Sequence, residues 1–253
     1  MKPASSSTVP GASTAGAPLY RTVKSSLLRA IEDRRYPAGG ALPSEAELAL
    51  GFGVSIGTLR HAMDELVAEQ ILLRRQGSGT YVAVHNAERS LFQYFHVERC
   101  DGLRESPQVD LVAFERLRIE EEPAQALGLK PGEPAIQVDN RLLLQGRAVI
   151  HDRLTLPALM FKGLTEKRFR ERKSTIYHLY QTEFGITVTK AHERARAVAA
   201  DRTAARIIGL TPGKPVMQLR RTALTFGGKP VEYRVSTIDT SRHDYVRLMS
   251  RPG

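Results

Sequence analysis

Residues 42–82 read LPSEAELALGFGVSIGTLRHAMDELVAEQILLRRQGSGTYV, and this stretch decides the fold of the first part of the chain. Ser44 followed by Glu47 forms a capping box that begins a short helix, and the glycines at 51 and 53 end it. Ser55 then begins a longer helix. Its apolar residues repeat with the spacing of one buried helical face, at Leu59, Ala62, Met63, Leu66 and Val67. The stretch therefore predicts a helix-turn-helix.

A helix before this stretch and a hairpin at its end complete the unit. Val23, Leu27 and Ile31 share one stripe of a helix that ends near Pro37. Residues 71–82 form an apolar and basic run around a glycine-rich turn, which predicts a tight hairpin with a basic tip. In a winged helix-turn-helix, the start of the third helix meets base edges and the hairpin tip approaches the phosphate backbone.

The composition is that of a globular protein, and the length of the chain allows two domains. The chain has 253 residues, of which 42% are hydrophobic and 25% charged, and no apolar run is long enough to span a membrane. Its single cysteine, Cys100, excludes an internal disulfide, and no metal-ligand spacing occurs. The net charge of +10 supports DNA binding only weakly, because residues 1–82 carry 9 Lys+Arg against 7 Asp+Glu. We expect a cytoplasmic protein without metal or cofactor.

Changes of texture along the chain predict its domain boundaries. Residues 1–17 are rich in Ser, Thr, Ala, Pro and Gly and are expected to be a disordered tail. The winged helix-turn-helix is predicted over 18–82, and a linker over 83–106, where periodicity is lost. A second domain is predicted over 107–250.

The second domain contains an internal duplication. LGLKPGEPAIQVDNRLLLQG at residues 127–146 recurs 81 positions later as IGLTPGKPVMQLRRTALTFG at residues 208–227. Each copy has a short helix, a Pro-Gly turn and two strand-like runs, and an alternating strand precedes it. We therefore expect an α+β domain: an antiparallel sheet of two related halves, with helices on one face and a ligand site in the crevice between the halves.

The first domain resembles the N-terminal domain of the GntR family of bacterial repressors, on the pattern quoted above. That resemblance implies DNA contacts by Ser44, Ser55, Thr58, Arg60, Gln76 and Gly77, and the positions of His61 and Arg75 add these two residues to the predicted DNA-binding set. Three positions depart from the family pattern: Ala46 and Ile56 stand where many members carry an arginine or a similar polar residue, and Gly57 follows Ile56. Because a guanidinium group can pair with guanine or phosphate, we expect the operator to differ from the family's common one.

The second domain resembles the UTRA domain of the HutC subgroup of GntR regulators, a fold related to chorismate lyase. The matching segments include STIYHLYQTEFGI at 174–186, AHERARAVAA at 191–200 and GGKPVEY at 227–233. The resemblance implies a dimerising small-molecule sensor, and carries over to these predicted effector-binding residues: Arg141, Asp152, Thr175, Tyr177, Glu193 and Glu232. Leu143 replaces one arginine of the common pair, which counts against a phosphosugar effector.

The combined prediction is a transcriptional regulator, by resemblance a repressor, that binds a near-palindromic operator as a homodimer and responds to a small anionic metabolite. Two alternatives stay open. The lyase-related fold allows an enzyme, although the sequence has no His-Glu-x-x-His, Walker or Gly-x-Ser-x-Gly motif. A DNA-binding protein without any ligand would show no response of its DNA affinity to metabolites.

Overall fold

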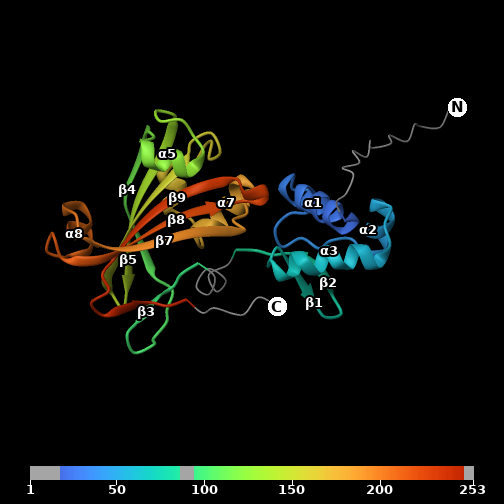
Figure 1. Cartoon of the computed structure of the whole chain (residues 1–253), viewed down its shortest axis with the longest axis horizontal. Helices are drawn as coiled ribbons and strands as arrows, with labels where there is room; N and C mark the ends of the chain where they lie inside the picture. The colour runs from blue at the N-terminus through green and yellow to red at the C-terminus, as the bar shows by residue number, and fades with distance from the viewer. Residues whose placement is uncertain (1–17, 86–93, 248–253) are drawn as a thin grey trace.

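The computed structural model describes residues 18–85 and 94–247, and Figure 1 traces the whole chain. The tail predicted over 1–17 lies outside the described residues. A membrane-crossing helix would need a longer and more apolar stretch than any helix within the described ranges offers. The chain forms an N-terminal helical unit, referred to below as the head, and a larger sheet domain (Figure 1).

The head has the predicted three helices and hairpin. They are α1 (Leu19–Glu32), α2 (Glu45–Phe52), α3 (Ile56–Ala68), β1 (Leu72–Arg75) and β2 (Gly79–Val82). Ser44 and Glu47 form the expected capping box on α2, and the Ser55 side chain accepts a hydrogen bond from the Thr58 N–H at the start of α3. The apolar faces of α1 and α3 pack together around Leu27, Leu59 and Leu66. The predicted fold of the head is confirmed.

The sheet domain is built from two copies of one unit. Its six strands are β4 (Gln108–Arg118), β5 (Pro134–Leu144), β6 (Arg147–Pro157), β7 (Lys190–Ala199), β8 (Pro215–Leu224) and β9 (Pro230–Ile238). They lie antiparallel in the order β4-β5-β6-β9-β8-β7. Strands β4, β5 and β6 form the first half, and β7, β8 and β9 form the second. The halves meet where β6 pairs with β9, so the duplication read from the sequence is the symmetry of the sheet.

Helices cover both faces of this sheet, and the expectation of helices on one face is wrong. On one face, α5 (Glu121–Leu127) packs against Ala135 of β5. Its counterpart in the second half is α8 (Arg202–Ile208). Ile136, the next residue of β5, points to the other face and packs with α6 (Glu166–Arg170) and α7 (Ile176–Phe184). Helices α6 and α7 belong to the connection between the two halves, which has no counterpart in the repeat.

Two further contacts join parts of the chain that are distant in sequence. The short strand β3 (Val97–Arg99) lies within the segment expected to be a linker, 83–106, and pairs with β10 (His243–Tyr245) near the C-terminal end. At the turn between β8 and β9, Phe226 is buried in the same apolar cluster as the core of the head. The sheet domain therefore contacts the head through a hairpin turn.

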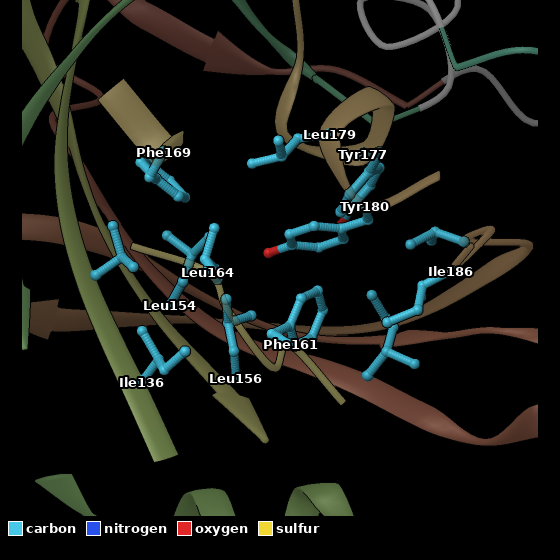
Figure 2. Packing of buried hydrophobic residues seen from close by; sticks show 14 of the residues in the cluster. Ile136, Leu154, Leu156, Phe161, Leu164, Phe169, Tyr177, Leu179, Tyr180 and Ile186 are labelled. Atoms are coloured by element: carbon cyan, nitrogen blue, oxygen red, sulfur yellow. The ribbon is translucent and has the colours of Figure 1, made fainter. Parts of the chain in front are cut away.

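The largest apolar cluster of the sheet domain lies between the sheet and α7 (Figure 2). Phe161, which follows β6, packs against the rings of Tyr180 and Phe184, with centroids 4.6 and 5.3 Å away. Leu154 and Leu156 of β6 are fully buried beside it (Figure 2). This cluster holds α7 on the sheet.

Replacing Phe161 with alanine should lower the free energy of unfolding by about 3–5 kcal/mol, because the change opens a cavity in this cluster. Chemical denaturation followed by circular dichroism measures the difference. Leu159→Ala, two residues earlier and 80% exposed, is the matched control and should change stability by no more than about 0.5 kcal/mol. Similar losses for the two variants would contradict the packing described.

Candidate functional site

The predicted DNA-binding residues lie at three neighbouring places on the head: the start of α2, the start of α3 and the tip of the hairpin. Thr58 is half-buried and the other members of the set are exposed: Ser44, Ser55, Arg60, His61, Arg75, Gln76 and Gly77. Ser44 and Ser55 cap α2 and α3, so their side chains also have a structural role. Gly77 has a φ of 72°, a left-handed conformation that favours glycine at the hairpin tip.

Ion pairs connect the parts of this surface. The Arg60 Nε donates to Glu45 Oε2 at 2.6 Å, so the third helix is joined to the start of the second. Arg74 of β1 contacts both Glu45 and Asp64, at 3.4 and 2.5 Å, which joins the hairpin to the helices. These pairs are solvent-accessible and contribute little to stability. Arg60 and Arg74 can therefore exchange their carboxylate partners for phosphates or base edges at a small cost in free energy.

Ring contacts fix two further predicted residues. The imidazole of His61 stacks on Tyr20 of α1, with ring centroids 4.0 Å apart and planes 5° from parallel. The guanidinium of Arg75 lies over the ring of Tyr81, 4.7 Å from its centroid, which supports the hairpin tip. Ile56, one of the three departures from the family pattern, is 44% exposed at the start of α3. This position presents an apolar side chain where the family commonly has a polar one.

A cavity of about 420 Å³ opens on the sheet face that carries α7. Its lining comes from both halves of the sheet, from the loop before α7 and from the end of the interdomain segment. The polar members of the lining include Asn140, Asp152, Arg172, Lys173, Thr175, Arg221 and Arg234. Tyr94, Phe95 and Tyr177 supply aromatic walls. The volume and the mixed lining fit a small polar metabolite.

Beneath the cavity lies a buried network of charges centred on Glu232, referred to below as the charged floor. This carboxylate is 0% exposed and accepts hydrogen bonds from the Tyr177 and Tyr180 hydroxyls at 3.2 and 2.7 Å. Arg234 donates to both of its oxygens, at 2.9 and 3.0 Å, and also donates to Asp152 Oδ2 at 3.0 Å. Burial, with the negative charge of Glu232, raises the pKa of Tyr177 and of Tyr180. Both phenols therefore stay protonated and can donate.

A second buried ion pair, between Arg221 and Glu193, supports another part of the cavity lining. Arg221 donates to Glu193 at 2.6 Å and to the backbone carbonyl of Tyr94, and the Tyr245 hydroxyl donates to the other oxygen of Glu193. Burial opposes ionisation of Glu193, yet the neighbouring Arg221 charge and the Tyr245 hydroxyl hold its pKa below the usual value. Glu193 is therefore an anion that fixes Arg221.

The predicted effector residues divide into three groups by position. Asp152, Thr175 and Tyr177 line the cavity. Arg141 lines an adjoining hollow that shares Arg172 with the cavity, and its guanidinium donates to Asp110 at 2.9 Å. Glu193 and Glu232 do not line the cavity, and instead hold the arginines that do.

Comparison with known proteins places both parts of the chain. Residues 19–82 match the bacterial regulatory proteins of the gntR family, and residues 103–244 match the UTRA domain. The chain belongs to the GntR family of regulators that carry a UTRA domain. It is 26% identical over 237 residues to the HTH-type transcriptional repressor NagR of Bacillus subtilis, covering 92% of this chain and 96% of that protein.

Two other similar proteins also carry names of regulators of transcription. The mannosyl-D-glycerate transport/metabolism system repressor MngR of Escherichia coli is 23% identical over 235 residues, with 92% of this chain and 97% of that protein covered. The crystal structure of the ligand-binding domain of a protein described as a GntR-family regulator from Bordetella bronchiseptica is 30% identical, with a TM-score of 0.58. That match covers 61% of this chain and 96% of that one. The fold of this GntR family member is thus the fold of its relatives.

Several residues that line the cavity of this GntR family member were not predicted from the sequence. Arg234 lies two positions after Glu232 on one strand, so period-two alternation alone places both on one face. Arg221 on β8 and Asn140 on β5 are each two residues away from buried apolar residues of the same strand. This alternation in the sequence indicates that both side chains face the core. Nothing local in the sequence indicates that Tyr94 or Arg172 faces the cavity.

For the head, we predict that Arg60→Ala weakens operator binding by about 1–3 kcal/mol, since it removes a guanidinium from the start of α3. Fluorescence anisotropy with labelled DNA from upstream of the chain's own gene, at fixed salt, measures the change. Arg35→Ala removes an equally exposed arginine beyond the end of α1 and is the charge-matched control. Equal affinities of Arg60→Ala and the unaltered chain would exclude Arg60 from the DNA-binding surface.

Proposed function

We propose that this chain is a metabolite-controlled transcriptional repressor of the HutC type, which binds a near-palindromic operator as a homodimer in the bacterial cytoplasm. The observation that carries the proposal is that one helix, α7, both lines the cavity and holds the segment leading from the head. A ligand that moves α7 would then move the head. Names of relatives such as NagR and MngR, both called repressors, support the direction of control.

The hold of α7 on the head consists of side-chain hydrogen bonds to the backbone just after β2. The Gln181 side chain accepts from the His85 N–H and donates to the Ala83 carbonyl, both at 3.0 Å. A ring nitrogen of His178 lies 3.0 Å from the His85 carbonyl oxygen. Tyr177, which lies one helical turn before Gln181 on α7, lines the cavity. The hairpin of β1 and β2 is the wing of the head. Its strand β2 ends at Val82, so the backbone held by α7 begins one residue later, at Ala83.

Tyr94, at the far end of the interdomain segment, gives a second connection. Its ring lies edge-on to Tyr177, with centroids 4.9 Å apart, and it also contacts the ring of His85 at 5.8 Å. Because Tyr94 lines the cavity as well, the two described ends of the segment meet over Tyr177. A ligand that displaces either tyrosine would change the position of His85 and therefore of the wing.

Among the predicted effector residues, we propose direct contacts to the ligand by Asp152, Thr175 and Tyr177, with Arg141 at the rim. Glu193 and Glu232 act by fixing the cavity arginines. We propose no catalytic role, because the polar groups of the floor are engaged with one another: Glu232 alone binds two tyrosines and one arginine. Preorganised donors of this kind recognise a ligand without needing to exchange protons with it.

A titration tests the function as a whole. Full-length protein is added to DNA from its own upstream region, at stated salt, with and without a panel of small anionic metabolites, and anisotropy reports binding. The proposal expects specific binding that one compound weakens tenfold or more, with the compound recovered unchanged by mass spectrometry. Binding that no compound alters would favour a ligand-independent DNA-binding protein, and conversion of the compound would favour an enzyme.

The role of α7 generates a sharper prediction. Gln181→Leu keeps the size of the side chain but removes its hydrogen bonds to residues 83 and 85, so coupling between cavity and head should fall. We expect the ratio of operator Kd values with and without the releasing compound to drop from tenfold or more toward one, while calorimetry still detects the compound. Thr182→Ala, on the exposed side of α7, is the control and should keep the ratio. A full response in Gln181→Leu would contradict this route.

A further inference from the structure

The guanidinium group that the β5 strand lacks at Leu143 is supplied from a different element. Arg172 stands in the loop between α6 and α7, and it lines both the cavity and the adjoining hollow that contains Arg141. Arg141 and Arg172 are therefore brought to one hollow by segments that are far apart in the sequence. A leucine at 143 does not deprive the site of a second arginine.

Within residues 18–85 and 94–247, Arg172 has no acidic partner, unlike the other arginines that line the cavity, among which Arg170 pairs with Glu166 at 2.7 Å. Arg221 and Arg234 each form buried ion pairs with carboxylates. Arg172 donates to the Phe169 carbonyl at 2.6 Å and lies over the Phe169 ring at 4.6 Å, while its Nε is buried without a hydrogen-bond partner among the described residues. Burial, with the nearby charge of Arg234, lowers the pKa of Arg172. Its positive charge is thus left largely uncompensated within the described parts of the chain.

Such a group is costly to the folded protein and favourable to an anion. A partly buried cation without a counter-charge loses hydration and gains little in return. Lys173, next in the sequence, also lines the cavity and adds a second positive charge. The N-terminal end of α7, capped by Thr175, also lines the cavity, and the positive end of the helix dipole favours an anion there. An anionic group bound here would satisfy all three.

The cavity also presents hydrogen-bond acceptors. Asn140 and Asp152 are 4% and 3% exposed, both line the cavity, and the Oδ1 atom of each is buried without a partner among the described residues. Buried acceptors of this kind are normally satisfied. Because they accept hydrogen bonds, they call for hydroxyl or amine donors on whatever fills the cavity.

We propose that Arg172 is a specificity-determining residue that binds the anionic group of the effector, and that the effector also carries hydroxyl or amine groups that donate to Asn140 and Asp152. The ligand class is a small hydroxylated or amino-bearing phosphate or carboxylate. This inference rests on the proposed function, because it assumes that the cavity is the effector site.

The test uses full-length protein without DNA, so that it stands apart from the operator titration. Inorganic phosphate, acetate and glycerol 3-phosphate are titrated at constant ionic strength, and binding is followed by melting temperature and calorimetry. Phosphate and acetate distinguish the two kinds of anion, and glycerol 3-phosphate adds hydroxyl donors. We expect the unaltered chain to bind at least one simple anion, and glycerol 3-phosphate more tightly than phosphate.

Arg172→Gln should weaken binding of all these anions tenfold or more, because it removes a charged donor. Without anion, its melting temperature should equal or exceed that of the unaltered chain, a result that a merely structural arginine would not give. Arg172→Lys keeps the charge and should bind with intermediate affinity. Arg168→Gln removes the same charge from α6, outside the cavity lining, and should bind as the unaltered chain does.

Asn140→Ala tests the acceptor side of the cavity. It should reduce the preference for glycerol 3-phosphate over phosphate toward one while leaving phosphate binding in place. The proposal is overturned if the unaltered chain binds none of the three anions, if Arg172→Gln binds them undiminished, or if it melts several degrees lower in their absence. Anion binding that requires Arg172, in a protein whose operator affinity no metabolite changes, would refute the proposed function and with it the effector role, and would leave Arg172 only as an anion-binding residue of the cavity.

Discussion

The buried carboxylate of Glu232 is the interaction on which the rest of the sheet domain depends. An unpaired charge in this position would cost several kcal/mol, so the surrounding residues must be arranged to compensate it. Arg234 supplies the counter-charge from the same strand and reaches across to Asp152 on β6, at the junction of the two halves. Tyr177 and Tyr180 complete the set from α7. One carboxylate therefore joins both halves of the sheet to the helix above them.

That arrangement makes α7 part of the sheet domain's interior and of its connection to the head at once. The hydroxyl groups of its tyrosines are bound to the charged floor, while His178 and Gln181 are bound to the backbone that follows the wing. A helix fixed at several points moves as a unit, so a small change at its N-terminal end is carried to the other contacts. Under the proposed function, a small displacement of α7 is therefore enough to change the orientation of the head.

Local rules predicted the local structure well. The capping box at Ser44 and the cap at Ser55 give the starts of α2 and α3, and the repeat beginning at Leu127 gives the two halves of the sheet. These signals succeed because the interacting groups are a few residues apart. The face chosen by α7 could not be predicted in this way, since it depends on packing between segments that are distant in sequence.

The candidate site shows the same division. Asp152, Thr175 and Tyr177 were chosen by resemblance and do line the cavity, whereas Glu193 and Glu232 lie behind it. A strand pattern gives the face of a side chain but not whether another side chain covers it. Arg172 and Tyr94 reach the cavity from loops, where no periodicity exists to indicate direction. Sequence reading therefore found part of the site on β6 and at the start of α7, and missed the strand residues Asn140, Arg221 and Arg234 as well as the loop residues.

The hairpin turns of the two halves show how a repeated unit can acquire separate tasks. Gln145 and Phe226 occupy equivalent places in the two copies, as do Gly146 and Gly227, and both glycines keep positive φ angles. The backbone N–H of Gln145 donates to Glu105 in a neighbouring loop, while Phe226 is buried against the head. Equivalent turns of the two halves therefore have different surroundings: the turn at Gln145 is exposed, and the turn at Phe226 is buried against the head. The sheet is symmetric in its strands, but of the two turns only the one at Phe226 joins the core of the head, so the head lies at one end of a repeated structure.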